Sequence, residues 1–563
     1  MTTASTRIWR AWPRWLALSG FMVCIAAGMF LPVYTDEIGW RFQERAAVDG
    51  VDGMFNDLCG PNSLGHPPWF MMPARWYSAI ANQTFADPMF VRIEGVLCAI
   101  AWAAMLWALV ARLEPDRARR TRLHAVAFAM LGLGLLPFLL VMSRPEQPIM
   151  LAYTLMMLIA LGSPSGQISV TGSWSRAAAW AKCGAIVVLI TIAASYHVKG
   201  VLYAPVALVC LACCATGRGT LLPRGAAIVA AISVALGAAH YWGDHLKCVA
   251  GNPLLAAHYA RENVASLLTS SHPASGLIGQ FASGLNPFEY VMLALASNWP
   301  MSRWLPEGLF PVAALLTVNV VFLILWLAAA ALSVRALAQF IRVERIRAFL
   351  QPRVPIALAI LACIVVWGAS QIKRNVYEAA HVLPMLVIFC MLCLTVPRAA
   401  RVDPVPARWP AWAAVIMVIS QAIVLYLVFP PLLAAAGVPG YLDRQPYSVS
   451  IAGYGQVRRD IDRAMRMSGI PVTRPLHRLL IDDVTYLALQ KDTLPLHRLG
   501  VVGAWSDGID DPVGYLRSRD SDGVVMGCRF LPPDMRAAAS RSGQICAISR
   551  DGLERLDETG APD

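Results

Sequence analysis

The chain has 563 residues, of which 57% are hydrophobic and 15% charged, with a mean hydropathy of +0.54 and a net charge of +12. Soluble globular proteins carry about 25% charged residues, so this composition excludes a soluble protein and indicates a polytopic membrane protein. The excess positive charge lies in arginine clusters that flank apolar segments, which argues against a nucleic-acid partner.

Eleven apolar segments are long enough to be read as transmembrane helices, for which about 20 residues are needed. The predicted fold class is therefore an α-helical polytopic membrane protein of about eleven transmembrane helices. We expect these helices at residues 15–34, 90–111, 124–142, 147–163, 180–196, 201–216, 225–242, 308–334, 354–370, 379–396 and 411–430.

Basic residues predict the orientation of these helices. Arg7, Arg10 and Arg14 precede the first segment, and arginines recur in every second loop. By the positive-inside rule, the N-terminus is expected in the cytoplasm and the C-terminus outside it. The first segment has no small-residue cleavage site and is interpreted as an uncleaved anchor. The excess of arginine over lysine is typical of GC-rich bacterial genomes, so we expect a bacterial inner-membrane protein.

Three segments on the outer side are long enough to be structured, namely residues 35–90, 243–305 and 431–563. The last has strand-like apolar runs at 479–481 and 524–526 and a helical pattern at 454–467. We therefore expect a transmembrane domain over 1–430 and an extracytoplasmic α/β domain over 431–563. Asp482 and Asp483 follow one of the runs; a sugar or an ion could bind there, although solvated loop acids are commoner.

Nine of the thirteen cysteines lie in the apolar segments, where cysteine usually acts as a small hydrophobe. The other four, an even number, lie in a compartment expected to be oxidising. We expect Cys528 to pair with Cys546 inside the tail, and Cys59 with Cys248 between the two long loops. The alternative, unpaired buried thiols, stays open. The loops contain no cysteine or histidine spacing that supports a zinc site.

Asp36 and Glu37 follow the first apolar segment directly. A carboxylate pair is expensive to hold near hydrocarbon unless it does chemistry, binds an ion or faces water. The pair therefore points to a membrane-embedded enzyme whose active site faces the far side of the bilayer.

About 30 residues later the same loop contains His66-Pro67-Pro68. An acidic pair after the first helix, this His-Pro-Pro segment and the many-helix layout resemble the GT-C glycosyltransferases, in particular the protein O-mannosyltransferase and aminoarabinose transferase branch. The resemblance covers residues 15 to about 400 and does not extend to the tail.

The resemblance implies transfer of a sugar, with inversion, from a polyprenyl-phosphate donor to an acceptor hydroxyl or amine at the outer membrane surface. Asp36 is then the expected base, and Glu37 orients the acceptor or shapes the field around Asp36. His66 would contact the donor phosphate or the acceptor. The alternatives are a solvated charge pair at a helix end and a turn histidine that caps the next helix.

Four cations stand in short outer turns, against the positive-inside trend. Arginine binds phosphate oxygens with a bidentate fork and lysine supplies a point charge, so we expect them to hold the donor phosphate. The alternative is that they reach toward lipid headgroups. These cations are Arg144, Lys199, Lys373 and Arg374.

Glu146 is expected to pair with Arg144 or with a sugar hydroxyl. We expect no essential metal and no other cofactor, because the first loop carries Asp-Glu rather than the Asp-x-Asp of the oligosaccharyltransferases. A polar stripe that enters a membrane helix should face a cavity, where it would bind sugar or acceptor. That stripe consists of Arg374, Tyr377, Glu378 and His381.

The sequence leaves the sugar open and allows a glycan, a lipid or a protein as acceptor. Two other classes remain. A ligase or polymerase of polyprenyl-linked glycans would share the lipid donor, but would more often rely on arginine and histidine in one large loop. A secondary transporter would show helices broken at mid-bilayer and related halves, and the sequence has no clear internal repeat.

Overall fold

The computed structural model describes most of the helical part and most of the tail. Several predicted site residues, Asp36, Cys59, His66, Lys373 and Arg374, lie outside it, and only the helical backbone is described for Cys248, Tyr377, Glu378 and His381. The described residues are 2–30, 33–34, 37–38, 41, 76, 80, 87–134, 136–162, 173–214, 220–251, 309–369, 376–396, 405, 408–436, 448–449, 453–472, 477–489, 493–499, 514, 516 and 521–560.

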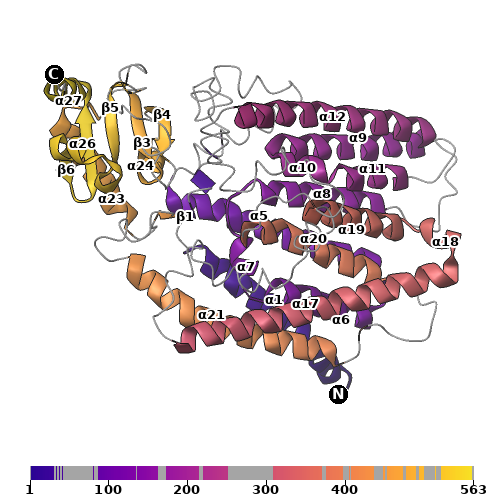
Figure 1. Cartoon of the computed structure of the whole chain (residues 1–563). Coiled ribbons are helices and arrows are strands. Elements are labelled where there is room, and N and C mark those ends of the chain that lie inside the picture. Colours follow the sequence, from indigo (N-terminus) through magenta and orange to yellow (C-terminus); the bar gives the residue numbers. More distant parts are fainter. Residues whose placement is uncertain are drawn as a thin grey trace, which may run out of the picture.

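Helices fill the apolar part of the chain (Figure 1). In chain order they are α1 (Thr2–Gly28), α5 (Pro88–Leu113), α6 (Arg117–Leu131), α7 (Leu136–Leu139), α8 (Glu146–Leu161), α9 (Ser173–Tyr196), α10 (Val198–Leu202), α11 (Ala204–Cys213), α12 (Leu221–Gly251), α17 (Leu309–Glu344), α18 (Ile346–Phe349), α19 (Arg353–Ala369), α20 (Val376–Leu394) and α21 (Trp409–Ala436). Helix α12 continues to Gly251, into the predicted outer loop, and α21 continues six residues past the predicted domain boundary at 430.

The chain is a multi-pass membrane protein. Within the described residues, five helical stretches are long and apolar enough to cross a membrane. Several of them place apolar side chains on the outside of the bundle, as a lipid-facing surface requires. The five stretches are Pro88–Leu113, Arg176–Tyr196, Leu221–Tyr241, Val320–Glu344 and Trp409–Tyr426.

Two segments expected as single helices are broken. In the first, α6 ends before Gly132, and Gly134 adopts a left-handed conformation with φ +60° before α7 begins. The side-chain amide of Gln421 on α21 donates to the carbonyls of Gly132 and Gly134, and the Gly134 amide donates to the Ser420 hydroxyl. The last long helix thus satisfies the backbone groups that the break releases. In the second segment, α10 and α11 are separate because Pro205, at the start of α11, has no N–H.

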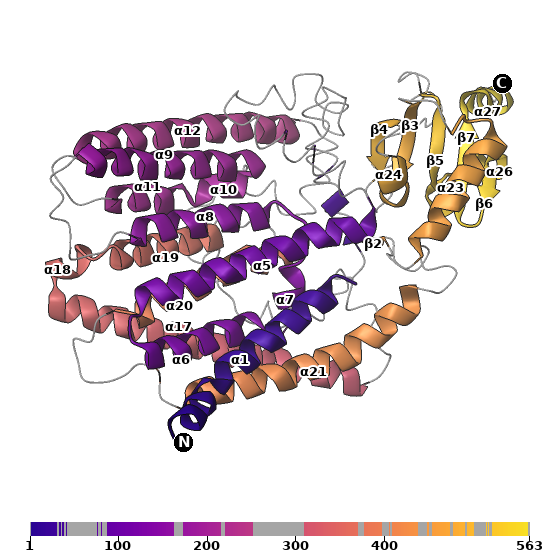
Figure 2. The same ribbon diagram turned by 180° about the vertical axis from the view of Figure 1, so that it is seen from behind.

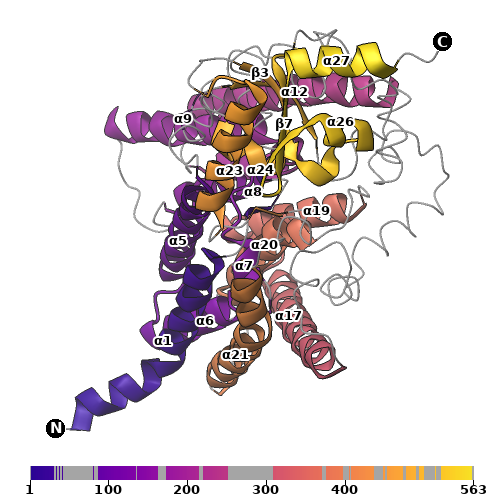
Figure 3. The same cartoon turned by 90° about the vertical axis from the view of Figure 1, so that its left-hand side faces the viewer.

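The tail contains a five-stranded sheet with the strand order β4-β3-β5-β7-β6. Strand β3 runs parallel to β4 and β5, whereas β7 runs antiparallel to β5 and β6. The expected strands at 479–481 and 524–526 lie within β3 and β5, and the expected helix is α23 (Figure 3). The elements are α23 (Tyr454–Ser468), β3 (His477–Asp482), α24 (Asp483–Leu489), β4 (Thr493–Leu499), β5 (Gly523–Gly527), α26 (Pro533–Ala538), β6 (Ser540–Ser542), β7 (Ile545–Ser549) and α27 (Arg550–Gly560).

A two-stranded ladder joins the tail to the segment that carries the acidic pair (Figure 2). Strand β1 (Val33–Tyr34) pairs antiparallel with β2 (Ser448–Val449). Val33 and Ile38 are fully buried and share an apolar cluster with Val91 of α5 and with Ile461 and Tyr486 of the tail. The tail sheet is therefore packed against the end of the helical body at which the loop between α1 and α5 begins.

Candidate active site

A buried cluster of charged residues lies at this same end of the helical body. Its residues come from the loop between α1 and α5, the start of α5, the turn between α7 and α8, the first turn of α8, and α10. The buried charge cluster comprises Glu37, Arg41, Arg92, Glu94, Ser143, Arg144, Glu146 and Lys199.

Glu37 is fully buried and both of its carboxylate oxygens are engaged. One oxygen lies 2.9 Å from a guanidinium nitrogen of Arg92, and the other accepts the backbone N–H of Ser143 at 2.6 Å. Glu37 therefore ties the segment next to Asp36 to α5 and to the turn before Arg144.

A second group of contacts surrounds Ser143. Arg41 forms an ion pair with Glu94 of α5 and also donates to the Ser143 hydroxyl at 3.2 Å. The same hydroxyl donates to Glu94 at 2.9 Å. The backbone and side chain of Ser143 thus join the loop between α1 and α5, helix α5 itself and the α7–α8 turn at one point.

Glu146 holds two of the predicted phosphate ligands. The Arg144 guanidinium approaches both of its oxygens, at 3.0 and 3.2 Å, and the Lys199 ammonium lies 3.0 Å from one of them. Glu146 and Lys199 are 2% and 5% exposed. The expected pairing of Glu146 with Arg144 is present, and Lys199 joins it from a part of the chain 53 residues away.

Local interactions fix the two cations in these positions. The Arg144 amide donates to Gln147 in the first turn of α8, and the Gln147 amide group donates back to the Leu140 carbonyl. His197 accepts the Lys199 amide at 3.2 Å and caps the short helix α10. Gly200 is essential to this packing, because a Cβ there would overlap the Ala193 carbonyl.

The first helix ends earlier than the sequence analysis expected. Helix α1 ends at Gly28 rather than near residue 34, and strand β1 separates it from Asp36 and Glu37. Pro32 follows the helix in sequence and disfavours its continuation. The strand that precedes Glu37 in the chain is thus held by an inter-strand contact with the tail.

The structure brings Glu37, Arg144, Glu146 and Lys199 together. Sequence reasoning missed Arg41, Arg92 and Glu94. Arg92 and Glu94 had an available signal, because ionisable residues inside an apolar segment are rare and usually functional. The other predicted ligands, Asp36, His66, Lys373, Arg374, Tyr377, Glu378 and His381, have no described side chain.

The described members of the cluster include four cations and three carboxylates. Low polarity strengthens the charge interactions among them. Each of the three carboxylates is paired with a cation, and the described residues contain no group of three metal-ligating side chains.

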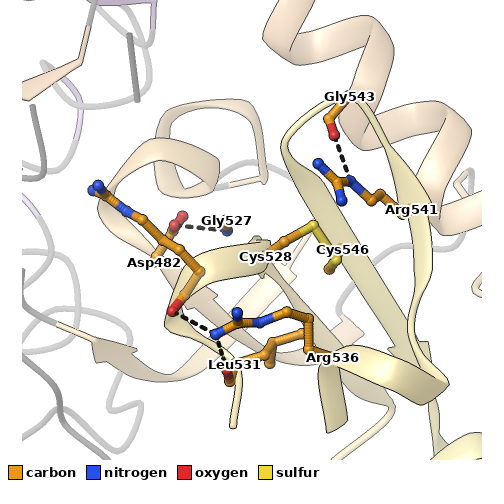
Figure 4. Close-up of a disulfide and its surroundings, with 9 residues drawn as sticks. Asp482, Gly527, Cys528, Leu531, Arg536, Arg541, Gly543 and Cys546 are labelled. Carbon is orange, nitrogen blue, oxygen red and sulfur yellow. Dashed lines mark hydrogen bonds between the residues drawn. A yellow bond between two sulfur atoms is a disulfide. The ribbon is translucent and has the colours of Figure 1, made fainter. Parts of the chain in front are cut away.

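The other acidic pair, Asp482 and Asp483, lies in the tail, where Asp482 has a structural role. Asp482 is fully buried and accepts hydrogen bonds from the Thr485 amide and hydroxyl, both at 2.8 Å, and from the Gly527 amide at 2.9 Å (Figure 4). Burial raises the pKa of Asp482, while these donors oppose the rise. The side chain fixes the turn from β3 into α24 and is not a solvated loop acid.

The expected disulfide of the tail is present (Figure 4). Cys528 follows β5 and Cys546 lies on β7, with their Cα atoms 4.8 Å apart. The bond links the segment directly after β5 to the neighbouring antiparallel strand β7.

No family model and no curated protein matches the chain. Among solved structures, it is similar to ArnT from Cupriavidus metallidurans bound to undecaprenyl phosphate, with 14% identity over 99% of each chain and a TM-score of 0.43. It is also similar to the Archaeoglobus fulgidus oligosaccharyltransferase in complex with an inhibitory peptide and a dolichol-phosphate, with 10% identity over 96% of this chain and 72% of that chain, and a TM-score of 0.40. Another structure of that enzyme, with a TM-score of 0.40, holds zinc and sulfate. Both proteins are members of the GT-C superfamily, which the sequence resembles.

Proposed function

We propose that the chain is a glycosyltransferase of the bacterial inner membrane that moves a sugar from a polyprenyl-phosphate donor to an acceptor at the outer face. The observation that carries the proposal is the shared ion pair in which Arg144 and Lys199 converge on Glu146. Two cations held by one buried carboxylate, at the end of a set of membrane helices, form a site suited to a phosphate attached to a lipid.

The donor would keep its polyprenyl chain in the bilayer and place its phosphate beside Arg144 and Lys199. Glu146 would hold both cations in position and contact a sugar hydroxyl. In this proposal Lys373, Arg374 and His66 supply further phosphate contacts. The helical stripe of Tyr377, Glu378 and His381 would face the sugar or the acceptor.

Asp36 would act as the base. Its carboxylate takes the proton from an acceptor hydroxyl or amine while that oxygen or nitrogen attacks the anomeric carbon. The bond from this carbon to the phosphate oxygen breaks, so the configuration inverts and polyprenyl phosphate leaves as an anion. The cations stabilise the charge that develops on the leaving phosphate, and Glu37 positions the Asp36 segment through Arg92 and Ser143.

The proposal includes eleven crossings, a cytoplasmic N-terminus and an extracytoplasmic tail. It requires no metal or other cofactor, and the acceptor is a glycan, a lipid or a protein. A ligase or polymerase of polyprenyl-linked glycans is the alternative enzyme, because it would use the same cations for the same lipid phosphate.

One observation bears on the transporter alternative, namely the break between α6 and α7. Transporters place broken helices at their binding sites. Here Gln421 and Ser420 already hydrogen-bond to the backbone at the break, and the buried charge cluster lies at one end of the helical body. The arrangement therefore favours an enzyme.

The test is transfer of radiolabelled sugar from a panel of polyprenyl-phosphate sugars to envelope extract. Purified wild type, Asp36→Asn, Arg144→Gln and the control Arg176→Gln are compared in matched amounts. We expect product from one donor class, an Asp36→Asn rate lower by about 10²-fold or more, and an unchanged rate for Arg176→Gln. No transfer from any donor by folded wild type, or full activity in Asp36→Asn, contradicts the proposal. A product of polymeric size supports the polymerase alternative instead.

A further inference from the structure

The short helix α10 brings Lys199 to Glu146, and contacts on two sides set its place in the fold (Figure 1). On one side Gly200 lies against α9, where a Cβ at this position would lie 1.9 Å from the Ala193 carbonyl oxygen. On the other side the Tyr153 hydroxyl of α8 donates a hydrogen bond of 2.6 Å to the Gly200 carbonyl. Helix α10 is therefore held between α8 and α9 at the residue next to Lys199.

Helix α10 has five residues and depends on groups outside it for its position. The last four carbonyls of a helix have no donor within the helix, and a helix of this length is not stable alone. Its first turn is closed by the Gly200 amide, which donates to the His197 carbonyl at 2.8 Å. The Tyr153 hydroxyl adds a bond from a different helix and so fixes α10 relative to α8.

The Tyr153 side chain is itself held firmly. It is fully buried, and its ring lies 5.4 Å from the ring of Tyr203, the residue directly after α10, with the planes inclined at 58°. A buried tyrosine hydroxyl needs a hydrogen-bond partner, and here the partner is the backbone of α10. Ring and hydroxyl of Tyr153 thus both contact α10 or the residue that ends it.

Helix α8 therefore meets α10 at two points. Glu146 and Tyr153 lie about two turns apart on α8, which places them on the same face of that helix. The Glu146 carboxylate holds the Lys199 ammonium at 3.0 Å, and the Tyr153 hydroxyl holds the backbone one residue further on. Both ends of Lys199, its backbone and its charged group, are thereby fixed against one helix.

We infer that Tyr153 is a positioning residue for Lys199, whose hydroxyl raises the affinity of the site for the donor phosphate without touching the donor. The inference rests on the proposed function, in which Lys199 binds that phosphate. Lysine binds phosphate as a point charge on a flexible stem of four carbons. The contribution of Lys199 therefore depends on how firmly its backbone is held.

The experiment measures how tightly the purified full chain in micelles binds polyprenyl phosphate, a probe of the phosphate site that carries no sugar. Tyr153→Phe removes only the hydroxyl. The matched control, Thr154→Val, removes a buried hydroxyl from the next position of α8, where Thr154 donates to the Met150 carbonyl and accepts from the Trp102 indole. Lys199→Met and Tyr153→Phe/Lys199→Met complete a double-mutant cycle, and thermal melting shows that each protein is folded.

We expect Tyr153→Phe to bind the probe about 10-fold more weakly than wild type, the effect of leaving a buried carbonyl without its donor. Thr154→Val should bind as wild type does, even where its melting temperature falls. The double variant should bind no more weakly than Lys199→Met, because Tyr153 acts through Lys199.

Three results would overturn the inference and leave the proposed function in place, provided that Lys199→Met binds more weakly than wild type. They are wild-type affinity in Tyr153→Phe, an equal loss in Thr154→Val, and a double variant that is weaker than Lys199→Met by the full factor of Tyr153→Phe. Equal affinity of wild type and Lys199→Met would contradict the proposed phosphate site and this inference together.

Discussion

Removing one partner of the Glu37–Arg92 ion pair leaves an uncompensated charge inside the helical body. The two side chains are 0% and 1% exposed, and the joining N–O distance is 2.9 Å. Loss of one partner of a buried pair costs about 3–5 kcal/mol. We expect Glu37→Gln and Arg92→Met each to lower the free energy of unfolding by about 3 kcal/mol or more. The double variant should lose much less than the sum, because it leaves neither charge alone.

Equilibrium unfolding in mixed micelles measures this coupling in a double-mutant cycle. The matched control is the exposed ion pair of Arg458 with Asp87, whose side chains are 54% and 41% exposed at 3.4 Å. For the control we expect a coupling of at most about 1 kcal/mol. A Glu37–Arg92 coupling no larger than that of the control would refute the reasoning.

Three further predictions concern other parts of the molecule. Replacing both Cys528 and Cys546 by serine removes a link across 18 residues. This change should lower the free energy of unfolding of the tail by about 3 kcal/mol, and proteolysis of the full chain with and without reductant measures it. Gly95→Ala should strongly lower the melting temperature, because its Cβ would overlap a backbone oxygen of the neighbouring segment, whereas Gly184→Ala, which meets no atom within 4 Å, should not. Burial raises the pKa of Asp482, so the folded chain retains a proton that the unfolded chain releases near pH 3.8. Stability should therefore fall as the pH rises from that value to the raised native pKa, and Asp482→Asn should lack this pH dependence in melting curves.

The sequence predicted those features that depend on local pattern. Apolar runs located the five described stretches that are long and apolar enough to cross a membrane. Short apolar runs between Asp, Arg and Gly located β3 and β5, and a helical pattern located α23. Two outer cysteines close together in a short tail were enough to pair Cys528 with Cys546. In each case the signal lies in the composition of the segment itself or in the spacing of two cysteines 18 residues apart.

Features that depend on distant parts of the chain were missed. Strands β1 and β2 have two residues each and lie over 400 residues apart, so no periodicity reveals their ladder. The break at Gly134 is stable because Gln421 satisfies the released carbonyls, and only the packing of α21 shows this. The ion pairs of Arg92 and Glu94 could not be predicted from their own apolar segment, because their partners are in other segments.

The central claim is that Lys199 and Arg144 hold a lipid-linked phosphate while Asp36 removes the proton of the acceptor. The measurement that tests it most directly compares donor affinity and single-turnover release of polyprenyl phosphate in wild type, Asp36→Asn, Lys199→Met and the control Lys182→Met. The account predicts that Asp36→Asn binds the donor as wild type does but loses turnover, that Lys199→Met loses donor affinity, and that Lys182→Met behaves as wild type. Unchanged donor affinity in Lys199→Met together with unchanged turnover in Asp36→Asn would contradict it.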